Sequence, residues 1–215
     1  MIFTIQSRNE KFLEKIYDKS MKELDDFFCL NWRRNKPKIF LVKDRESINK
    51  LMGRNTQDWI VGWVNNANVF VLDKDTYEKE SCHKYSEKEY FSLIKHELAH
   101  IFTQVYSGIF NKPLRPDWLW EGVAIYLSDQ NKMKKKPAQL QEFLQHYSKD
   151  NKNSSVYKES GFAIEFLVKN FGKQKLLKLI KSLKEADSRS KFAKKFKEIY
   201  GFGLNYKSFQ KSSDK

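Results

Sequence analysis

The chain has 215 residues, of which 40% are hydrophobic, and its 5 Trp, 10 Tyr and 17 Phe provide large side chains for a substantial core. No apolar run approaches the roughly 20 residues that span a bilayer, which excludes a membrane-spanning helix. The net charge of +14 is uneven: residues 1–130 hold 20 Lys and Arg against 19 Asp and Glu, whereas residues 131–215 hold 21 against 8.

This basic C-terminal half is typical of a lysine-rich solvated surface, or of a surface that contacts nucleic acid, an anionic membrane or acidic protein. The first eight residues lack a charged segment followed by an apolar stretch, so no signal peptide is expected. Cys29 and Cys82 stand at unrelated positions and are expected to be free and reduced. Together these features predict a cytoplasmic protein.

The first half of the chain is predicted to mix strands with helices. Apolar residues at helical spacing predict a helix over Asn9–Leu30. Residues 65–67, Asn-Asn-Ala, form a turn signal between two apolar runs and predict a β-hairpin. Short apolar runs predict strands at Ile2–Gln6, Ile39–Val42, Trp59–Val64 and Asn68–Leu72.

The strongest helix signal covers Ser86–Ser107. Ser86 can cap its start and Gly108 can end it. One side of this helix is predicted to be buried, because apolar residues recur at helical spacing at Ile94, Leu98, Ile101 and Val105. Asp117 is then predicted to cap a helix over Trp118–Leu127.

After Pro137 the sequence predicts only helices, over Ala138–Tyr147, Ser155–Asn170, Lys173–Ala186, Lys191–Tyr200 and a short segment near Tyr206. This order predicts an α+β fold, with a sheet-bearing half at 1–130 and a basic helical subdomain at 131–215 that together form one compact domain.

The lysines at 132, 134, 135 and 136 are predicted to lie in a surface loop, where reversing their charge should leave cleavage of a short neutral peptide nearly unchanged.

Residues 96–100 read His-Glu-Leu-Ala-His. On a helix His96 and His100 lie one turn apart on one face, so both imidazoles can bind one metal ion. Glu121 follows His100 by 21 positions within an apolar segment, where an unpaired carboxylate would be costly, and is the predicted third ligand. His83, in a polar stretch, is the alternative third ligand.

Two histidines and one carboxylate are the ligands of a catalytic zinc site that keeps one position open for water. Glu97 is placed to take the proton of a zinc-activated water as it attacks a carbonyl, and then to pass that proton to the leaving amine. The motif therefore predicts one Zn²⁺ per chain and hydrolysis of a peptide or protein substrate, with Glu97 as general base.

The segments HELAHIFT (96–103) and PDWLWEGVAIYL (116–127) resemble the gluzincin metallopeptidases of the thermolysin and aminopeptidase N clan. A third segment, YKESGFAIEFLVKNFG (157–172), is similar to the tyrosine-bearing helix of that group, and the resemblance covers about residues 68–205. It implies a zincin-like fold: a small twisted mixed sheet whose edge strand binds substrate, an active-site helix below it, and an all-helical C-terminal subdomain. Asn68–Leu72 would be that edge strand.

The resemblance also implies a side chain across the cleft that stabilises the oxyanion, for which Tyr157 is the first candidate and Tyr126 the second. The chain departs from the family pattern at Ile125, because relatives often carry an acidic residue four positions after the glutamate ligand. That residue can orient a ligating histidine. The sequence does not identify the group that orients His96 or His100 in this chain, and Asp117 is a candidate.

The leading interpretation is a zinc metallopeptidase, and an endopeptidase because no amine-binding carboxylate motif precedes the helix. One alternative is a non-catalytic zinc-binding scaffold or regulatory protein, against which the presence of Glu97 argues. A second alternative is a nucleic-acid-binding protein built on the basic half, which lacks interleaved aromatic residues and any recognisable binding motif.

Overall fold

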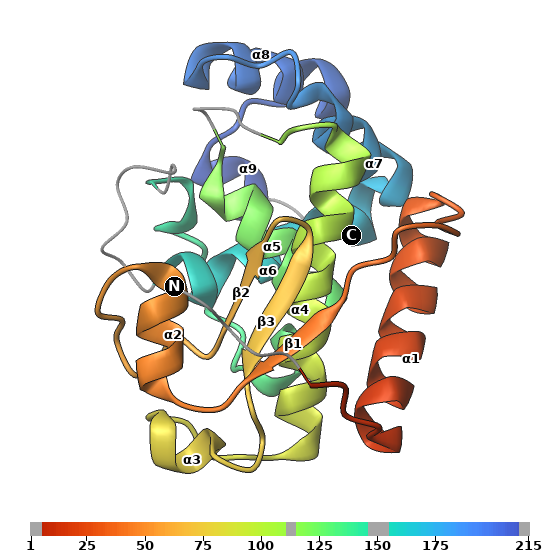
Figure 1. Ribbon diagram of the computed structural model, residues 1–215. Helices are drawn as coiled ribbons and strands as arrows, with labels where there is room; N and C mark the ends of the chain where they lie inside the picture. Colours follow the sequence, from red (N-terminus) through yellow and green to blue (C-terminus); the bar gives the residue numbers. More distant parts are fainter. Residues whose placement is uncertain (1–5, 111–114, 146–154, 211–215) are drawn as a thin grey trace.

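A computed structural model describes residues 6–110, 115–145 and 155–210 of the chain (Figure 1). These residues form a three-stranded sheet and a larger set of helices, which confirms the predicted α+β class. No helix in these three ranges is both long and apolar enough to cross a membrane. The elements are α1 (Lys11–Phe28), β1 (Ile39–Val42), α2 (Arg45–Met52), β2 (Gly62–Asn65), β3 (Asn68–Leu72), α3 (Tyr77–Glu80), α4 (Glu87–Ser107), α5 (Asp117–Leu127), η1 (Gln130–Met133), η2 (Phe143–Gln145), α6 (Ser155–Phe171), α7 (Lys173–Ser182), α8 (Arg189–Tyr200) and α9 (Tyr206–Gln210).

The sheet has the strand order β1-β3-β2. β1 runs parallel to β3, and β2 runs antiparallel to it. Asn66 and Ala67 connect β2 to β3 with φ values of 47° and 56°, as a tight two-residue hairpin turn requires. The expectation that Asn68–Leu72 is an edge strand is therefore wrong. β3 is the central strand, which explains its nearly continuous apolar sequence, and β2 is an edge.

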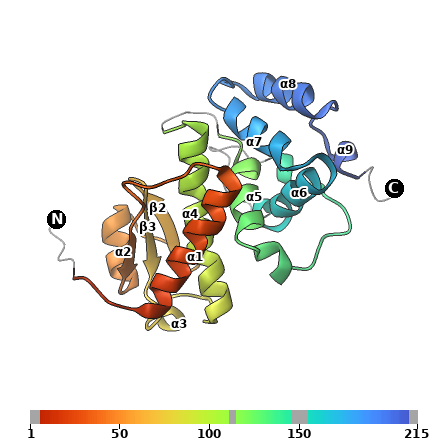
Figure 2. The same cartoon turned by 90° about the vertical axis from the view of Figure 1, so that its right-hand side faces the viewer.

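Helices cover both faces of the sheet. Figure 2 shows the sheet between α2 on one side and the layer of α1 and α4 on the other. The hydroxyl of Tyr90 on α4 donates a hydrogen bond to the Leu72 carbonyl oxygen at 2.9 Å, which ties α4 to the end of β3. α4 is therefore fixed against the sheet before it reaches the histidines.

Arg45, the first residue of α2, holds the loop that leads into β2. Its guanidinium donates to the carbonyl oxygens of Gln57 (3.0 Å), Asp58 (2.9 Å), Ile60 (2.6 Å) and Glu80 (2.8 Å). A guanidinium can satisfy several converging carbonyls at once because it has five N–H donors. The position of β2 thus depends on a residue outside the sheet.

The C-terminal helices pack on α5. Trp118 is fully buried, and its ring meets a group of aromatic rings at centroid distances of 5.3–6.5 Å, namely Phe143, Phe192, Phe196 and Phe209. Aromatic side chains bury large areas and stabilise such contacts in edge-to-face geometry. α5 is thereby anchored in the helical half of the molecule.

The predicted helix at Ala138–Tyr147 is wrong. The described part of that segment is irregular except for η2, and residues 146–147 lie outside the described residues. The buried carboxylate of Glu159 on α6 accepts hydrogen bonds from three successive backbone N–H groups, those of Gln141 (2.9 Å), Glu142 (2.8 Å) and Phe143 (3.1 Å). These contacts fold the segment onto α6 instead of letting it continue as a helix.

Other differences from the predicted elements are smaller. Asp117 is the first residue of α5 and Pro116 precedes it as the cap, so the predicted cap was one residue late. α2 and α3 were not predicted from the sequence. Gln6 is not in a strand, and the rest of the predicted strand at Ile2–Gln6 lies outside the described residues.

We expect Glu159→Ala to lower the free energy of unfolding by about 3 kcal/mol, because three backbone donors would lose a charged acceptor. Urea denaturation followed by circular dichroism measures this. Glu159→Gln is the matched control, since its amide oxygen can still accept, and it should lose less than the alanine variant. An alanine variant within about 0.5 kcal/mol of the wild type would contradict the anchoring role of Glu159.

Candidate metal centre

The helix that carries the two histidines has well-defined ends. At its start Ser86 Oγ accepts from the Glu89 N–H at 3.2 Å and donates to the Glu89 carboxylate at 2.9 Å, which caps the helix. At its end Gly108 has φ 69°, and its N–H bonds to the carbonyl oxygens of Gln104 and Val105. α4 therefore begins and ends as the sequence predicts.

α4 has a core face and a cleft face. Ile94, Leu98 and Ile101 are fully buried in the core. The other face lines a cleft of about 1210 Å³ at residues spaced by three or four, namely Glu89, Leu93, His96, Glu97, His100 and Gln104. From the first to the last of these the helix rises about 22 Å, long enough for six residues of extended peptide.

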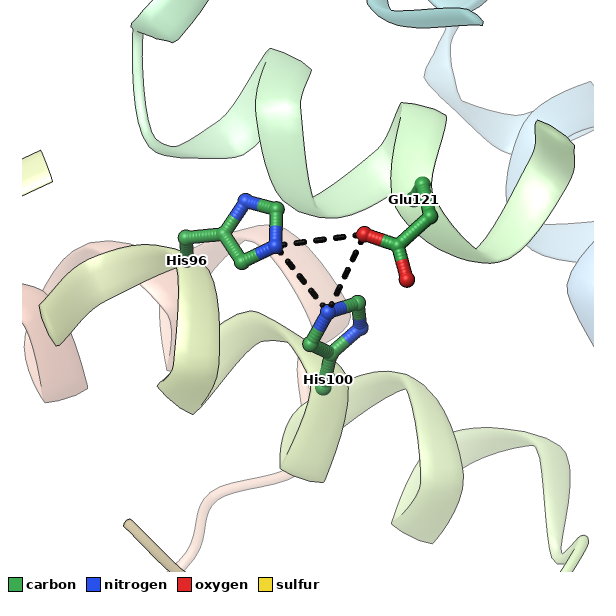
Figure 3. A group of neighbouring side chains, drawn as sticks. All are labelled: His96, His100 and Glu121. Carbon is green, nitrogen blue, oxygen red and sulfur yellow. Dashed lines mark hydrogen bonds and ion pairs between the residues drawn. The ribbon is translucent and has the colours of Figure 1, made fainter. Parts of the chain in front are cut away.

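His96, His100 and Glu121 meet in this cleft (Figure 3). The Nε2 atoms of the two histidines are 3.0 Å apart, and Glu121 Oε2 lies 3.3 Å from His96 Nε2 and 3.5 Å from His100 Nε2. A tetrahedral zinc ion with bonds of about 2.0–2.2 Å holds its ligand atoms roughly 3.3–3.6 Å apart. Both distances to Glu121 Oε2 lie in this range, and the distance between the two Nε2 atoms is about 0.3 Å shorter than its lower limit, so the three side chains converge closely enough to share one metal ion.

The chemistry of the donor atoms supports the same assignment. Glu121 Oε2 and the Nδ1 atoms of both histidines are buried and form no hydrogen bond within the described part of the chain. Burial acts to raise the pKa of Glu121, but the attraction of His100 and His96 outweighs it and lowers that pKa. Glu121 is therefore held as a carboxylate facing two imidazoles.

Glu97 lies beside this cluster and is 7% exposed. Burial raises its pKa to about 7, with His96 acting to lower it and Glu121 to raise it further. A Cβ placed on Gly62 of β2 would lie 3.2 Å from Glu97 Oε1. The small residue in β2 therefore leaves room for the carboxylate between the helix and the strand.

The group that orients the histidines is not the one suggested from the sequence. Neither Nδ1 atom is bonded to Asp117, and Ile125 is fully buried. Instead the Trp120 ring stacks on the His100 ring, with centroids 5.7 Å apart and an interplanar angle of 9°. Trp120 is thus a site residue that sequence reasoning missed, because an aromatic residue beside Glu121 was read only as part of an apolar run.

α5 and α6 approach each other closely next to Glu121. A Cβ on Gly122 would lie only 2.7 Å from the Ser160 carbonyl oxygen, so this position requires glycine. The close approach places Tyr157, in the first turn of α6, on the cleft wall. Burial raises the pKa of the Tyr157 phenol, and the charges of Glu121 and Glu97 raise it further.

Other residues named from the sequence lie elsewhere. Tyr126 does not line the cleft, and the charges that act on its hydroxyl come first from Glu165 and Lys169. His83 lines the cleft, but its Nε2 lies 3.1 Å from the Trp59 carbonyl oxygen and it is not part of the cluster. The third member of the described cluster is Glu121.

Lys134 is exposed in the segment after η1, as the predicted surface loop requires, but it also reaches the cleft. Its Nζ donates to the Tyr157 carbonyl oxygen at 3.0 Å, and it lines the cleft. Burial lowers its pKa, while the charge of Glu121 acts to raise it. This contact argues against including Lys134 among the lysines whose charge reversal is expected to leave cleavage nearly unchanged.

The opposite wall of the cleft is the sheet edge formed by β2. The Leu72 N–H donates to the Val61 carbonyl oxygen at 2.8 Å. Because bonding alternates along an antiparallel pair, the N–H and C=O groups of Gly62 and Val64 face away from β3. No other described strand pairs with that side of β2. The cleft is thus bordered by unpaired backbone donors and acceptors.

Three large apolar side chains are well exposed within the described ranges: Trp59 (48%), Phe110 (61%) and Tyr157 (40%). All three line this cleft. Exposed apolar groups that gather in one concave surface are typical of a binding site.

Comparison of the chain with protein-family models, with curated proteins and with solved structures gave no match. The chemistry and geometry of the cleft therefore indicate what the protein can do.

Proposed function

We propose that this chain is a zinc-dependent peptidase of the gluzincin type, with His96, His100 and Glu121 as metal ligands and Glu97 as general base. The observation that carries the proposal is the convergence of three ligand atoms within 3.5 Å of one another, next to a buried carboxylate, in a long cleft. A structural site would have no need for Glu97, or for a cleft that admits a peptide.

The zinc ion and the side chains of the protein would have different roles in the reaction. Zinc held by these ligands would supply Lewis acidity, which polarises a carbonyl and makes water more acidic. Glu97 takes the proton of the attacking water and returns it to the leaving amine. The Tyr157 phenol, on the wall of the same cleft, would donate a hydrogen bond to the carbonyl oxygen as negative charge develops on it. Its raised pKa keeps the phenol protonated for that role.

The substrate is held by strand addition on β2, not on β3 as the sequence suggested. The free backbone groups of Gly62 and Val64 can pair with an extended peptide, which would then lie across the face of α4 that carries His96 and Glu97. Because these hydrogen bonds involve only the substrate backbone, they place little restriction on the substrate side chains. This geometry supports cleavage within a chain, because the cleft continues on both sides of the cluster.

If the substrate binds by strand addition, N-methylation of its backbone amides should slow cleavage at alternating positions. Methylating an amide that pairs with Gly62 or Val64 should lower kcat/KM about tenfold or more per lost hydrogen bond, since the partner is left unsatisfied. Rates are measured on a series of peptides, each methylated once, with the matching side-chain swaps as controls. If every methylated peptide is cleaved at the parent rate, β2 does not hold the substrate.

The proposed function is tested by incubating purified protein with a peptide library and identifying the cut bonds by mass spectrometry. We expect cleavage that a chelator abolishes and that about one equivalent of zinc restores. Glu97→Gln protein, prepared in parallel, controls for a contaminating protease. Stoichiometric zinc without any cleavage would support the non-catalytic scaffold instead. Cleavage that persists both in the presence of the chelator and in the Glu97→Gln protein would contradict the proposal.

A further inference from the structure

One end of the cleft holds a cation that the proposed chemistry does not use. Arg115 lines the cleft, and its guanidinium carbon lies 4.8 Å from the Trp120 ring centroid. Trp120 in turn stacks on His100 at 5.7 Å. These two successive distances place the guanidinium no more than about 10.5 Å from the His100 ring. Arg115 is therefore close to the metal cluster without belonging to it.

The guanidinium is available to a ligand. Its Nε lies 3.6 Å from Asp117 Oδ1, beyond hydrogen-bond distance, and the side chain is 40% exposed. Its Nη1 and Nη2 atoms make no hydrogen bond with the described residues. An arginine over an aromatic ring keeps its in-plane N–H donors free, and their fork matches a carboxylate.

The surroundings of Arg115 include a second cation, Lys134, and the buried carboxylate of Asp117, which forms an ion pair with Arg115 Nε. Lys134 bonds to the Tyr157 backbone, and the charge of Arg115 acts on the phenol of the same residue. Both cations therefore lie around Tyr157, next to the cluster. A peptide carboxylate bound here would meet two cations, of which only Lys134 already has a hydrogen-bond partner.

We propose that Arg115 binds a carboxylate of the substrate, two or three residues from the cleaved bond. The distance follows from the advance of about 3.3–3.6 Å per residue of an extended peptide. The preferred substrates are then peptides with an acidic side chain at that position, or with a free C-terminus there. This inference rests on the proposed peptidase function and names the substrate class of the same site.

The test compares pairs of peptides that differ by one charge. Amidated peptides carrying Glu or Gln at each position around the cut bond probe an acidic side chain, and neutral peptides with a free or amidated C-terminus probe the terminal carboxylate. We expect wild-type protein to prefer one acidic member by about 10- to 100-fold in kcat/KM. Arg115→Gln should abolish this preference, and Arg115→Lys should keep part of it.

Lys84→Gln is the matched control, because Lys84 also lines the cleft but lies before the start of α4, where its Nζ is 3.6 Å from Glu78 Oε2. It should leave the preference intact. The inference is overturned if wild-type protein shows no preference, if Arg115→Gln retains it, or if Lys84→Gln loses it equally. It is also overturned if Arg115→Gln slows both members of a pair by the same factor, which would indicate that Arg115 only supports Trp120.

A binding measurement separates this inference from the proposed function. Calorimetry with Glu97→Gln protein and the same peptide pairs should show the 10- to 100-fold difference in Kd, and the double variant Glu97→Gln/Arg115→Gln should lose it. If wild-type protein cleaves no peptide but this difference in binding is found, the peptidase proposal fails while Arg115 still binds a carboxylate. Equal Kd values within every pair would reject the role of Arg115 even in an active peptidase.

Discussion

Glu97→Gln should retain the metal and lose peptide hydrolysis by about 10²- to 10⁴-fold, the usual contribution of a general base. The amide has the size of the carboxylate, so the three ligands keep their places, but it cannot accept the proton of the attacking water. Metal content is measured by elemental analysis and turnover on the best peptide from the library. The substitution should lower kcat more than it changes KM, because in the proposed binding mode the substrate pairs with β2 and not with Glu97.

The matched control for this variant is Glu89→Gln. Glu89 lies on the same face of α4, two turns before Glu97, and also lines the cleft. Its replacement should change the rate by less than about threefold, since an exposed charge at that distance is screened. A Glu97→Gln protein that cleaves at the wild-type rate would show that another group moves the proton.

Replacing His96, His100 or Glu121 by alanine should remove both the metal and the activity. Changes to residues that merely orient a ligand cost 10- to 100-fold in metal affinity, so loss of a ligand should exceed about 100-fold. The affinity is measured by competition with a chromogenic chelator, independently of turnover. If Glu121→Ala binds zinc as tightly as the wild type, Glu121 is not the third ligand.

His83→Ala is the control for these ligand variants. It removes a histidine from the same cleft, but one whose Nε2 contacts the Trp59 carbonyl oxygen and not the cluster. Metal affinity should stay within about threefold of the wild type, because no metal bond is lost. A large loss of affinity in His83→Ala would revive the alternative third ligand that the sequence left open.

The metal cluster could be predicted from the sequence because most of it is local. His96 and His100 are brought together by one turn of helix, and the signals at Ser86 and Gly108 fix where that helix begins and ends. Glu121 is distant in sequence, but an unpaired carboxylate among apolar neighbours is costly, and that cost pointed to a partner. Such arguments need no knowledge of how the helices pack.

The features that sequence reasoning missed depend on long-range contacts. β3 is the central strand because β1 pairs with its other side, which leaves β2 as an edge strand, and no local pattern reveals that choice. The segment before η2 is irregular because Glu159, 16 to 18 residues away, binds its backbone N–H groups. The stack of Arg115, Trp120 and His100 likewise forms only when α5 packs against α4.

The buried donor atoms of the cluster have a consequence for folding. Glu121 Oε2, which faces the Nε2 atoms of both histidines, lies out of water without a described hydrogen-bond partner, and such a group costs roughly 1–3 kcal/mol. The ligands come from α4, fixed to the sheet, and from α5, anchored among the C-terminal aromatics. An ion bound between them would relieve that cost and link the two halves, so the melting temperature should rise with zinc concentration and the apoprotein should be the less stable form.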